Sequence, residues 1–260
     1  MEIKNIDFTY NNNPFIVDLT AEIEKGKITT IIGPNGSGKS TLLSLLVKQN
    51  QPVAGTILLD GQSLNTMSTK ELAKKMAIVY QQNQAPGDFT VERLVRFGRA
   101  PYQSFFKNTD DEEEEVVAWA LKVTRLEAMK DKKVSELSGG ERQRAWIAMS
   151  LAQKTDILFL DEPTTYLDIY FQYEILSLVK ELNEKYHMTI VMVLHDINQA
   201  IQFSDNIIIM KRGKIIYKGN VVDGITQQRL KEVYGITADI RWCEDNGCPY
   251  IVPLMERKHA

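Results

Sequence analysis

Apolar positions along the chain follow two different periods, and each period predicts one kind of element. Residues 3–10 and 15–20 alternate apolar and polar positions, which is typical of strands with one buried face. Continuous apolar runs at 28–32, 157–162 and 189–194 indicate strands buried on both faces. Further strand-like runs lie at 55–59, 76–80, 207–210 and 214–217. The chain is therefore expected to contain an extensive β structure.

Between residues 90 and 150 the strand pattern stops, and the chain looks helical. Ser68–Glu71, Thr109–Glu112 and Ser138–Glu141 fit the capping box that opens a helix. Another helix is expected after Asp168, through Tyr173 to Tyr186. Strands interrupted by a helical stretch predict an α/β fold with a helical insertion between strands of the core.

The composition argues against some classes of protein but does not identify the function. The chain has 260 residues, 43% apolar and 25% charged, and a net charge of −3. This balance argues against a dedicated nucleic-acid binder. No apolar run is long enough to cross a bilayer and no signal pattern opens the chain, so we expect it to be cytosolic. We interpret the two cysteines, Cys243 and Cys248, as reduced thiols, with a bridge between them as the alternative.

One glycine-rich stretch has the pattern G-x-x-x-x-G-K-[ST] and joins an apolar strand to an apolar helix. It consists of Gly33, Pro34, Asn35, Gly36, Ser37, Gly38, Lys39, Ser40 and Thr41. Its glycines let backbone N–H groups point at an anion, and the helix start adds partial positive charge. Lys39 can reach the outer phosphates of a nucleotide, and Ser40 can offer its hydroxyl to Mg²⁺. The stretch therefore predicts a phosphate-binding loop.

A second helix start is also rich in glycine. Ser138, Gly139 and Gly140 open the helix, although glycine costs up to ~1 kcal/mol relative to alanine in a helix. Ser138 and Glu141 can be an ordinary capping box. The exposed N–H groups and the serine hydroxyl can equally form a second anion site.

Two carboxylates end the apolar run at 157–162. Strand alternation would send Asp161 and Glu162 to opposite faces, which implies different partners. Asp161 suits the Mg²⁺ shell of a nucleotide, and Glu162 can polarise a water for attack on the γ-phosphate. The alternative is a strand that merely ends in exposed acids.

Three further side chains are candidates because they lie at strand ends. Tyr10 can stack on adenine or be a half-exposed strand tyrosine. Gln81 can be a ligand of Mg²⁺ or water, or part of a solvated polar loop. His195 follows an apolar strand, where the carboxyl ends of parallel strands meet a ligand, although a lone histidine is usually structural.

Together these motifs resemble the ATP-binding cassette (ABC) ATPases over about residues 1–220. The resemblance rests on the phosphate loop, Leu137–Glu141 shortly before the run at 157–162, Asp168 and His195. It implies a P-loop NTPase (RecA-like) α/β core with an antiparallel β subdomain and an inserted helical subdomain. It also implies a head-to-tail homodimer that sandwiches two ATP molecules with Mg²⁺.

The resemblance also implies a role for each candidate residue. Tyr10 would stack on adenine, and residues 33–41 would bind the phosphates. Ser138, Gly139 and Gly140 would face the γ-phosphate held by the second copy, and Asp168 would contact that copy. Gln81, or Gln82 next to it, would sense Mg²⁺ and the membrane partner, while Ser40 and Asp161 would complete the metal shell. Glu162 would be the catalytic base and His195 would contact the γ-phosphate.

A narrower resemblance is to importer ATPases for iron–siderophore complexes, haem and cobalamin. It rests on Gly98–Tyr102, Pro163–Ile169 and Cys248–Leu254. It implies an ATPase bound through integral permease subunits to the cytoplasmic face of the membrane, served by an extracytoplasmic solute-binding protein. The alternatives are a non-transport ABC ATPase, an exporter subunit and a module that senses ATP without hydrolysing it.

The motifs also suggest a division of the chain. Residues 1–87 and 151–220 would form the nucleotide-binding core, and residues 88–150 the helical subdomain with the signature stretch at Ser138. Residues 221–260 would be a C-terminal extension of the same domain, to which the sequence assigns no chemistry.

Overall fold

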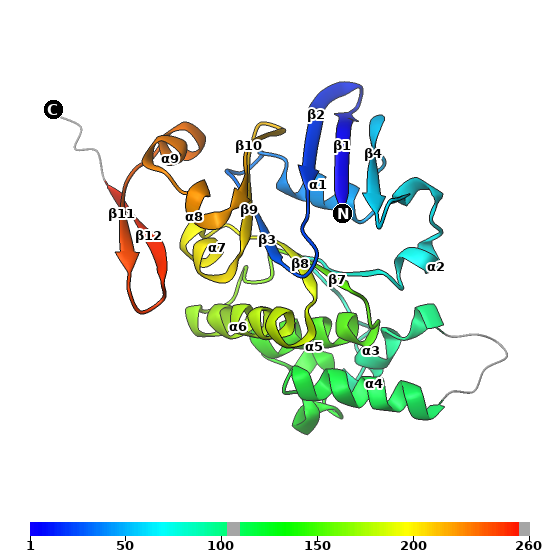
Figure 1. Cartoon of the computed structure of the whole chain (residues 1–260). Coiled ribbons are helices and arrows are strands. Elements are labelled where there is room, and N and C mark those ends of the chain that lie inside the picture. Colours follow the sequence, from blue (N-terminus) through cyan, green and yellow to red (C-terminus); the bar gives the residue numbers. More distant parts are fainter. Residues whose placement is uncertain (103–109, 255–260) are drawn as a thin grey trace. The chain divides into compact units, whose positions relative to one another are not determined.

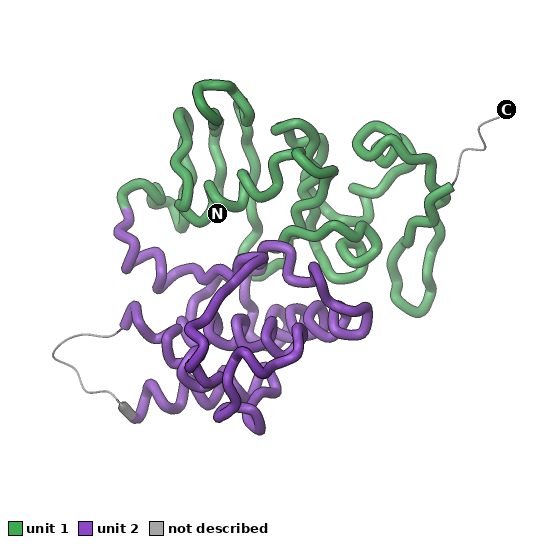
Figure 2. The backbone as a smooth tube through the Cα atoms, turned by 180° about the vertical axis from the view of Figure 1, so that it is seen from behind, with its two compact units in different colours: residues 1–66, 191–260 green, residues 67–190 purple. Residues whose placement is uncertain are grey.

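A computed structural model of the chain describes residues 1–102 and 110–254, and these divide into two compact units. Figure 2 colours the first unit green (residues 1–66 and 191–260) and the second purple (residues 67–190). The first unit is thus built from both ends of the chain. The boundaries expected from the motifs, at 87, 150 and 220, stay a prediction.

The first unit begins with a four-stranded antiparallel sheet. Its strands are β1 (Glu2–Tyr10), β2 (Asn13–Glu22), β4 (Ala54–Leu59) and β5 (Gln62–Ser63), in the order β2-β1-β4-β5. Ile3, Ile6 and Phe8 of β1 are buried. Ile6 and Phe8 follow the alternating pattern, whereas Ile3 and Ile6 are three positions apart. The register shifts between Ile3 and Phe8, where β1 and β2 are irregular.

The first unit also contains parallel strands. β3 (Ile28–Ile32) pairs in parallel with β9 (Asn206–Lys211), and β10 (Lys214–Asn220) adds antiparallel to β9. The strand order is β10-β9-β3-β8, where β8 (Thr189–Val193) begins in the second unit and ends in the first. All residues of β3 and β8 are buried, which explains their continuous apolar runs. The helices α1 (Lys39–Leu46) and α7 (Ile197–Phe203) follow β3 and β8.

The C-terminal part of the first unit adds two short helices and a hairpin (Figure 1). The helices are α8 (Val221–Gly224) and α9 (Gln227–Tyr234), and Asn220 caps α8 through its side chain. The hairpin strands are β11 (Thr237–Cys243) and β12 (Cys248–Leu254). Cys243 lies directly opposite Cys248, and both are free thiols.

The second unit is mainly helical. Its strands β6 (Met76–Val79) and β7 (Ile157–Asp161) run parallel, in the order β8-β7-β6. Its α-helices are α2 (Thr69–Leu72), α3 (Val91–Phe97), α4 (Asp110–Val123), α5 (Gly139–Ala152) and α6 (Ile169–Tyr186). Short 3-10 helices lie at Leu64–Thr66 in the first unit and at Ala100–Tyr102, Glu127–Met129 and Val134–Glu136 in the second.

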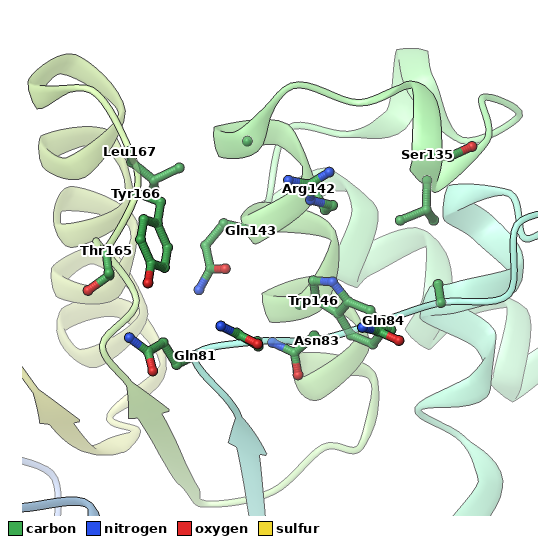
Figure 3. Close-up of a pocket in the computed structure, with 14 residues that line it drawn as sticks. Gln81, Asn83, Gln84, Ser135, Arg142, Gln143, Trp146, Thr165, Tyr166 and Leu167 are labelled. Atoms are coloured by element: carbon green, nitrogen blue, oxygen red, sulfur yellow. The ribbon is translucent and has the colours of Figure 1, made fainter.

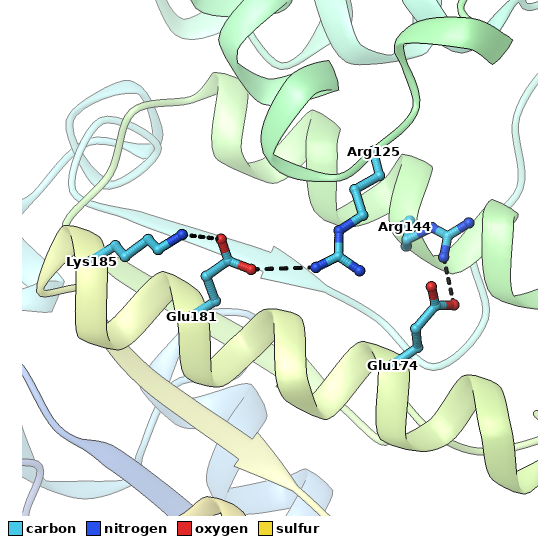
Figure 4. A network of polar contacts seen from close by, with 5 residues as sticks. All are labelled: Arg125, Arg144, Glu174, Glu181 and Lys185. Atoms are coloured by element: carbon cyan, nitrogen blue, oxygen red, sulfur yellow. Dashed lines mark hydrogen bonds and ion pairs between the residues drawn. The ribbon is translucent and has the colours of Figure 1, made fainter.

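Ion pairs connect α6 to its neighbours within the second unit (Figure 4). The partly buried Arg144 of α5 donates to Glu174 of α6 at 2.6 Å. Glu181 of α6 pairs with Lys185 one turn along at 2.6 Å and with Arg125 at 3.7 Å. The exposed pairs contribute at most about 1 kcal/mol each, so apolar packing remains the main source of stability.

The predicted elements are confirmed in type. Capping boxes are present at Ser68 and Ser138, whereas Thr109 of the third lies outside the described residues. No helix in the described part of the chain is long and apolar enough to cross a membrane.

Candidate functional site

The phosphate-loop stretch lies between β3 and α1, as predicted. Gly33 has a φ of 153°, and a Cβ atom there would clash with the carbonyl oxygen of Met210 and lie 2.6 Å from the Ser37 hydroxyl. Gly38 is the N-cap of α1 in a left-handed conformation. Only glycine fits Gly33 without strain, so this loop conformation depends on the sequence pattern.

Lys39 is enclosed by its own loop. Its ammonium donates to the carbonyl oxygens of Gly33 at 3.0 Å and Pro34 at 3.3 Å, and the residue is only 5% exposed. The Ser37 hydroxyl is also buried and has no hydrogen-bond partner among the described residues. A buried ammonium, an orphaned hydroxyl and a helix N-terminus are groups that fit the phosphates of a nucleotide.

Tyr10 is held beside the same loop. Its hydroxyl lies 2.9 Å from the Thr41 hydroxyl, and its ring packs against Phe8 and Phe15. The residue remains 47% exposed. Part of the ring is therefore available for stacking, next to the first turn of α1.

The two carboxylates after β7 differ in their backbone as well as in their partners. Asp161 is the last residue of β7, and its charge adds to burial in raising the pKa of Tyr80, just past the end of the neighbouring strand β6. Glu162 lies outside the strand with a φ of 50°. We expected strand alternation to send the two side chains to opposite faces. That reason was wrong, because Glu162 is in a left-handed turn and not in the strand.

Glu162 is fixed by two hydrogen bonds to one oxygen. Its Oε2 accepts from the Gln81 side-chain amide at 2.6 Å and from the Thr165 hydroxyl at 3.1 Å. This contact favours Gln81 over Gln82 as the glutamine of the site. Thr165 was not singled out from the sequence, and its position three residues after Glu162 in a turn is the only signal that could have suggested it.

The start of α5 serves as a capping box. Ser138 N–H donates to Glu141 Oε2 at 2.8 Å, and Ser138 Oγ accepts from Glu141 N–H. The first of these bonds is the main cause that lowers the pKa of Glu141. Ser138 and Gly139 are exposed, so the helix start remains accessible to an anion.

Packing supplies a second reason for glycine at the start of α5. A Cβ atom on Gly140 would lie 2.6 Å from the ring of Phe171 in α6, a separation that real Cβ atoms essentially never show. On Gly139 it would lie 3.2 Å from a methyl group of Leu167. The presence of glycine here, despite its cost in a helix, suggested an anion site. The close approach of α5 and α6 explains part of that choice.

A groove of about 510 Å³ lies in the second unit beside these residues. Figure 3 shows Gln81, Asn83 and Gln84 along one loop, with Arg142 and Gln143 of α5 above them. The turn from Thr165 to Leu167 forms another wall of the groove. The lining is mostly polar and uncharged.

Asp168 and His195 both precede helices. Asp168 is the exposed N-cap residue of α6, without a side-chain cap bond in the described structure. His195 is exposed and comes directly before Asp196, which caps α7 by accepting from Gln199 N–H at 2.9 Å. His195 thus lies between β8 and α7, at the carboxyl end of a strand as expected.

The candidate residues thus fall into two groups. The first unit brings Tyr10 together with the phosphate loop and holds His195. The second unit brings Gln81 together with Glu162 and also carries Asp161, Asp168 and the start of α5. The first group can bind phosphate groups. The second group offers carboxylate and amide oxygens that can bind a metal ion, and a carboxylate that can activate a water.

Comparisons with known proteins agree with this chemistry. The family model described as "ABC transporter" matches residues 16–165. The petrobactin import ATP-binding protein FpuC of Bacillus anthracis is 45% identical over 240 residues, which cover 92% of this chain and 88% of the relative. The iron(3+)-hydroxamate import ATP-binding protein FhuC of Bacillus subtilis is 44% identical, covering 92% and 89%.

Solved structures show the same similarity. The structure of cbiO1 from Clostridium perfringens, part of the ABC transporter complex cbiONQ, has a TM-score of 0.80 at 30% identity, covering 89% of this chain and 92% of that one. The dimeric structure of the bacterial ABC transporter cassette MJ0796 has a TM-score of 0.73 at 31% identity, covering 85% and 98%.

Proposed function

Because the chain belongs to the ABC transporter family, we propose that it is the ATP-hydrolysing subunit of a membrane importer for iron–siderophore complexes. The observation that carries this proposal is the 44–45% identity, over 92% of the chain, to two import ATP-binding proteins for iron chelates. The enclosed Lys39 in its glycine loop supports the ATP-binding part independently.

In this proposal the side chains have separate roles in hydrolysis. Residues 33–41 bind the phosphates of ATP, and Tyr10 stacks on adenine. Glu162 is the base that takes a proton from the attacking water, and the bonds from Gln81 and Thr165 hold its carboxylate. His195 contacts the γ-phosphate.

Ser40, Asp161 and Gln81 supply the oxygen donors that Mg²⁺ prefers, so these residues fit the metal that accompanies ATP. Bound there, Mg²⁺ would neutralise charge on the phosphates.

The functional form in this proposal is a head-to-tail homodimer. Ser138, Gly139 and Gly140 face the γ-phosphate bound by the second copy, and Asp168 contacts that copy. The exposure of Ser138 and Gly139 supports this role, and the bacterial cassette at 31% identity has a dimeric structure. ATP then closes the dimer and hydrolysis reopens it.

Dimer closure would drive integral permease subunits, which keep the ATPase at the cytoplasmic face of the membrane. A permease segment would lie in the groove between Gln81 and the start of α5, whose polar lining fits an exposed connecting segment. An extracytoplasmic solute-binding protein would deliver the iron complex to the permease.

The chemistry is tested by replacing the proposed base. Glu162→Gln removes the proton acceptor but keeps the size of the side chain, so we expect ATP binding and ATP-dependent dimerisation to persist while turnover falls by at least about 100-fold. Phosphate release and light scattering measure the two properties. Turnover at the parent rate would exclude Glu162 as the base.

The transport assignment is tested by what accompanies the tagged full chain from detergent-solubilised native membranes. An integral permease encoded with an iron-chelate binding protein is the expected partner. A purely soluble partner would leave the ATPase in place and overturn the transport role. Lys39→Ala should lose ATP binding. Partners that accompany the parent chain but not this variant therefore depend on ATP.

A further inference from the structure

The C-terminal hairpin β11–β12 has no role in the function proposed above. It packs on α9 through β11 and on α7 through β12, within the first unit (Figure 1). Ala238 and Ile251 are buried on the packed side. The hairpin is thus attached to the helix that follows His195.

The attachment includes two reciprocal hydrogen bonds. Asn198 Nδ2 of α7 donates to the Ile251 carbonyl at 3.2 Å, and Ile251 N–H donates to Asn198 Oδ1 at 2.8 Å. Both polar backbone groups of Ile251 therefore face α7 rather than Ile240, the residue opposite in the hairpin. The Asn198 amide pairs with the hairpin edge as an adjacent strand would.

α7 is short, and its orientation must come from such contacts. It has seven residues, too few for a helix that is stable by itself. Asp196 caps its first turn, and His195 comes directly before this cap. On the other side, Leu194 N–H donates to the Ile31 carbonyl at 3.3 Å. His195 is therefore connected at one end to the sheet and at the other, through α7, to the hairpin.

We propose that the C-terminal hairpin positions His195 for ATP hydrolysis, with Asn198 as the positioning residue. This inference rests on the proposed function, in which His195 contacts the γ-phosphate. Asn198 acts through α7, and loss of its bonds lets the first turn of α7 and the adjoining histidine shift. A misplacement of about 1 Å can cost ~100-fold in rate. The phosphate loop that binds ATP lies between β3 and α1, so we expect the affinity for ATP to change less than the rate.

The test is Asn198→Ala in the full chain, measured as steady-state ATP hydrolysis. We expect kcat per folded molecule to fall by about 10-fold or more, while KM for ATP changes less than about 2-fold. The matched control is Asn220→Ala, which removes the 2.9 Å hydrogen bond from Val222 N–H in the same unit. Its kcat should stay within about 2-fold of the parent value.

A second variant keeps the test valid if Asn198→Ala does not fold. Asn198→Asp can still accept from Ile251 N–H but cannot donate to the Ile251 carbonyl, so it should also lower kcat at unchanged KM. The proposal is overturned if both variants match Asn220→Ala, or if their loss disappears once activity is expressed per folded molecule. It is also overturned if KM rises while kcat is constant.

The same experiment separates this inference from the proposed function. A parent chain that does not hydrolyse ATP would contradict the proposed function itself, and a His195→Ala variant with parent activity would contradict the role of His195 on which this inference rests. A parent that is active and impaired by His195→Ala, combined with normal Asn198 variants, would contradict only the positioning role.

Discussion

Glu162 is a single residue whose backbone and side chain are both constrained. A left-handed conformation costs a residue with a Cβ roughly 1–2 kcal/mol, and Glu162 adopts it with a φ of 50°. The hydrogen bonds from Gln81 and Thr165 then fix one carboxylate oxygen. Such strain is retained where the surroundings determine the geometry, which is typical of residues that must meet a reactant in one orientation.

Gly140 gives a prediction at the same scale. Alanine at this position gains up to ~1 kcal/mol of helix propensity but places a methyl group against the Phe171 ring, which costs ~1–3 kcal/mol. We expect Gly140→Ala to lower the free energy of unfolding by about 1–2 kcal/mol in urea denaturation.

Gly139→Ala is the matched comparison in the same helical turn. Its methyl group meets only the flexible end of Leu167, so this variant should be neutral or slightly stabilising. Phe171→Leu in the Gly140→Ala background should recover stability. Equal effects of the two alanine variants would show that packing on α6 is not the reason for Gly140.

At the scale of elements, the capping box of α5 should make stability depend on pH. The bond from Ser138 N–H lowers the pKa of Glu141, so its charged form stabilises the fold above the ordinary value of 4.5. This contribution is lost as the pH falls through the lower, folded-state pKa. Because the carboxylate is largely solvated, we expect less than about 1 kcal/mol.

Glu141→Gln isolates this charge, since glutamine keeps an acceptor oxygen for the cap. The difference in free energy of unfolding between parent and variant should be largest above pH 5 and shrink below pH 4. Urea titrations at several pH values measure it. A difference that is the same at all pH values would mean that the charge contributes nothing to the cap.

Elements whose stability comes from local signals were predictable from the sequence. The run at 28–32 is β3, and the helix after Asp168 is α6. The attachment of the β11–β12 hairpin to α7 was not predictable, because it joins Ile251 to Asn198, 53 residues earlier, and no local pattern indicates such a contact. The choice between Gln81 and Gln82 required the contact with Glu162, since a loop has no fixed period of side-chain directions.

At the scale of the whole molecule, partner binding can be separated from ATP hydrolysis. Ala85 lines the groove in the second unit, and tryptophan there would fill part of its 510 Å³. We expect Ala85→Trp to reduce the permease recovered with the tagged chain by about 10-fold, the equivalent of ~1.4 kcal/mol.

The control for this variant is Glu127→Trp, which adds the same side chain at an exposed residue outside the groove. Quantitative immunoblotting of the solubilised complex compares the two. Normal permease recovery with Ala85→Trp would exclude the groove as the docking site. Equal losses with both variants would indicate a general effect of an exposed tryptophan.

The construction of the first unit from both chain ends has a consequence for synthesis on the ribosome. Ile28 at the start of β3 donates to Asp205, which is 177 residues later. The buried surroundings of β3 therefore cannot form until the intervening helical unit has been translated. During that interval the nascent chain exposes a segment that is prone to aggregate. Strand pairs between residues so distant in sequence also form slowly. The chain should accordingly depend on chaperones that shield early strands until translation is nearly finished.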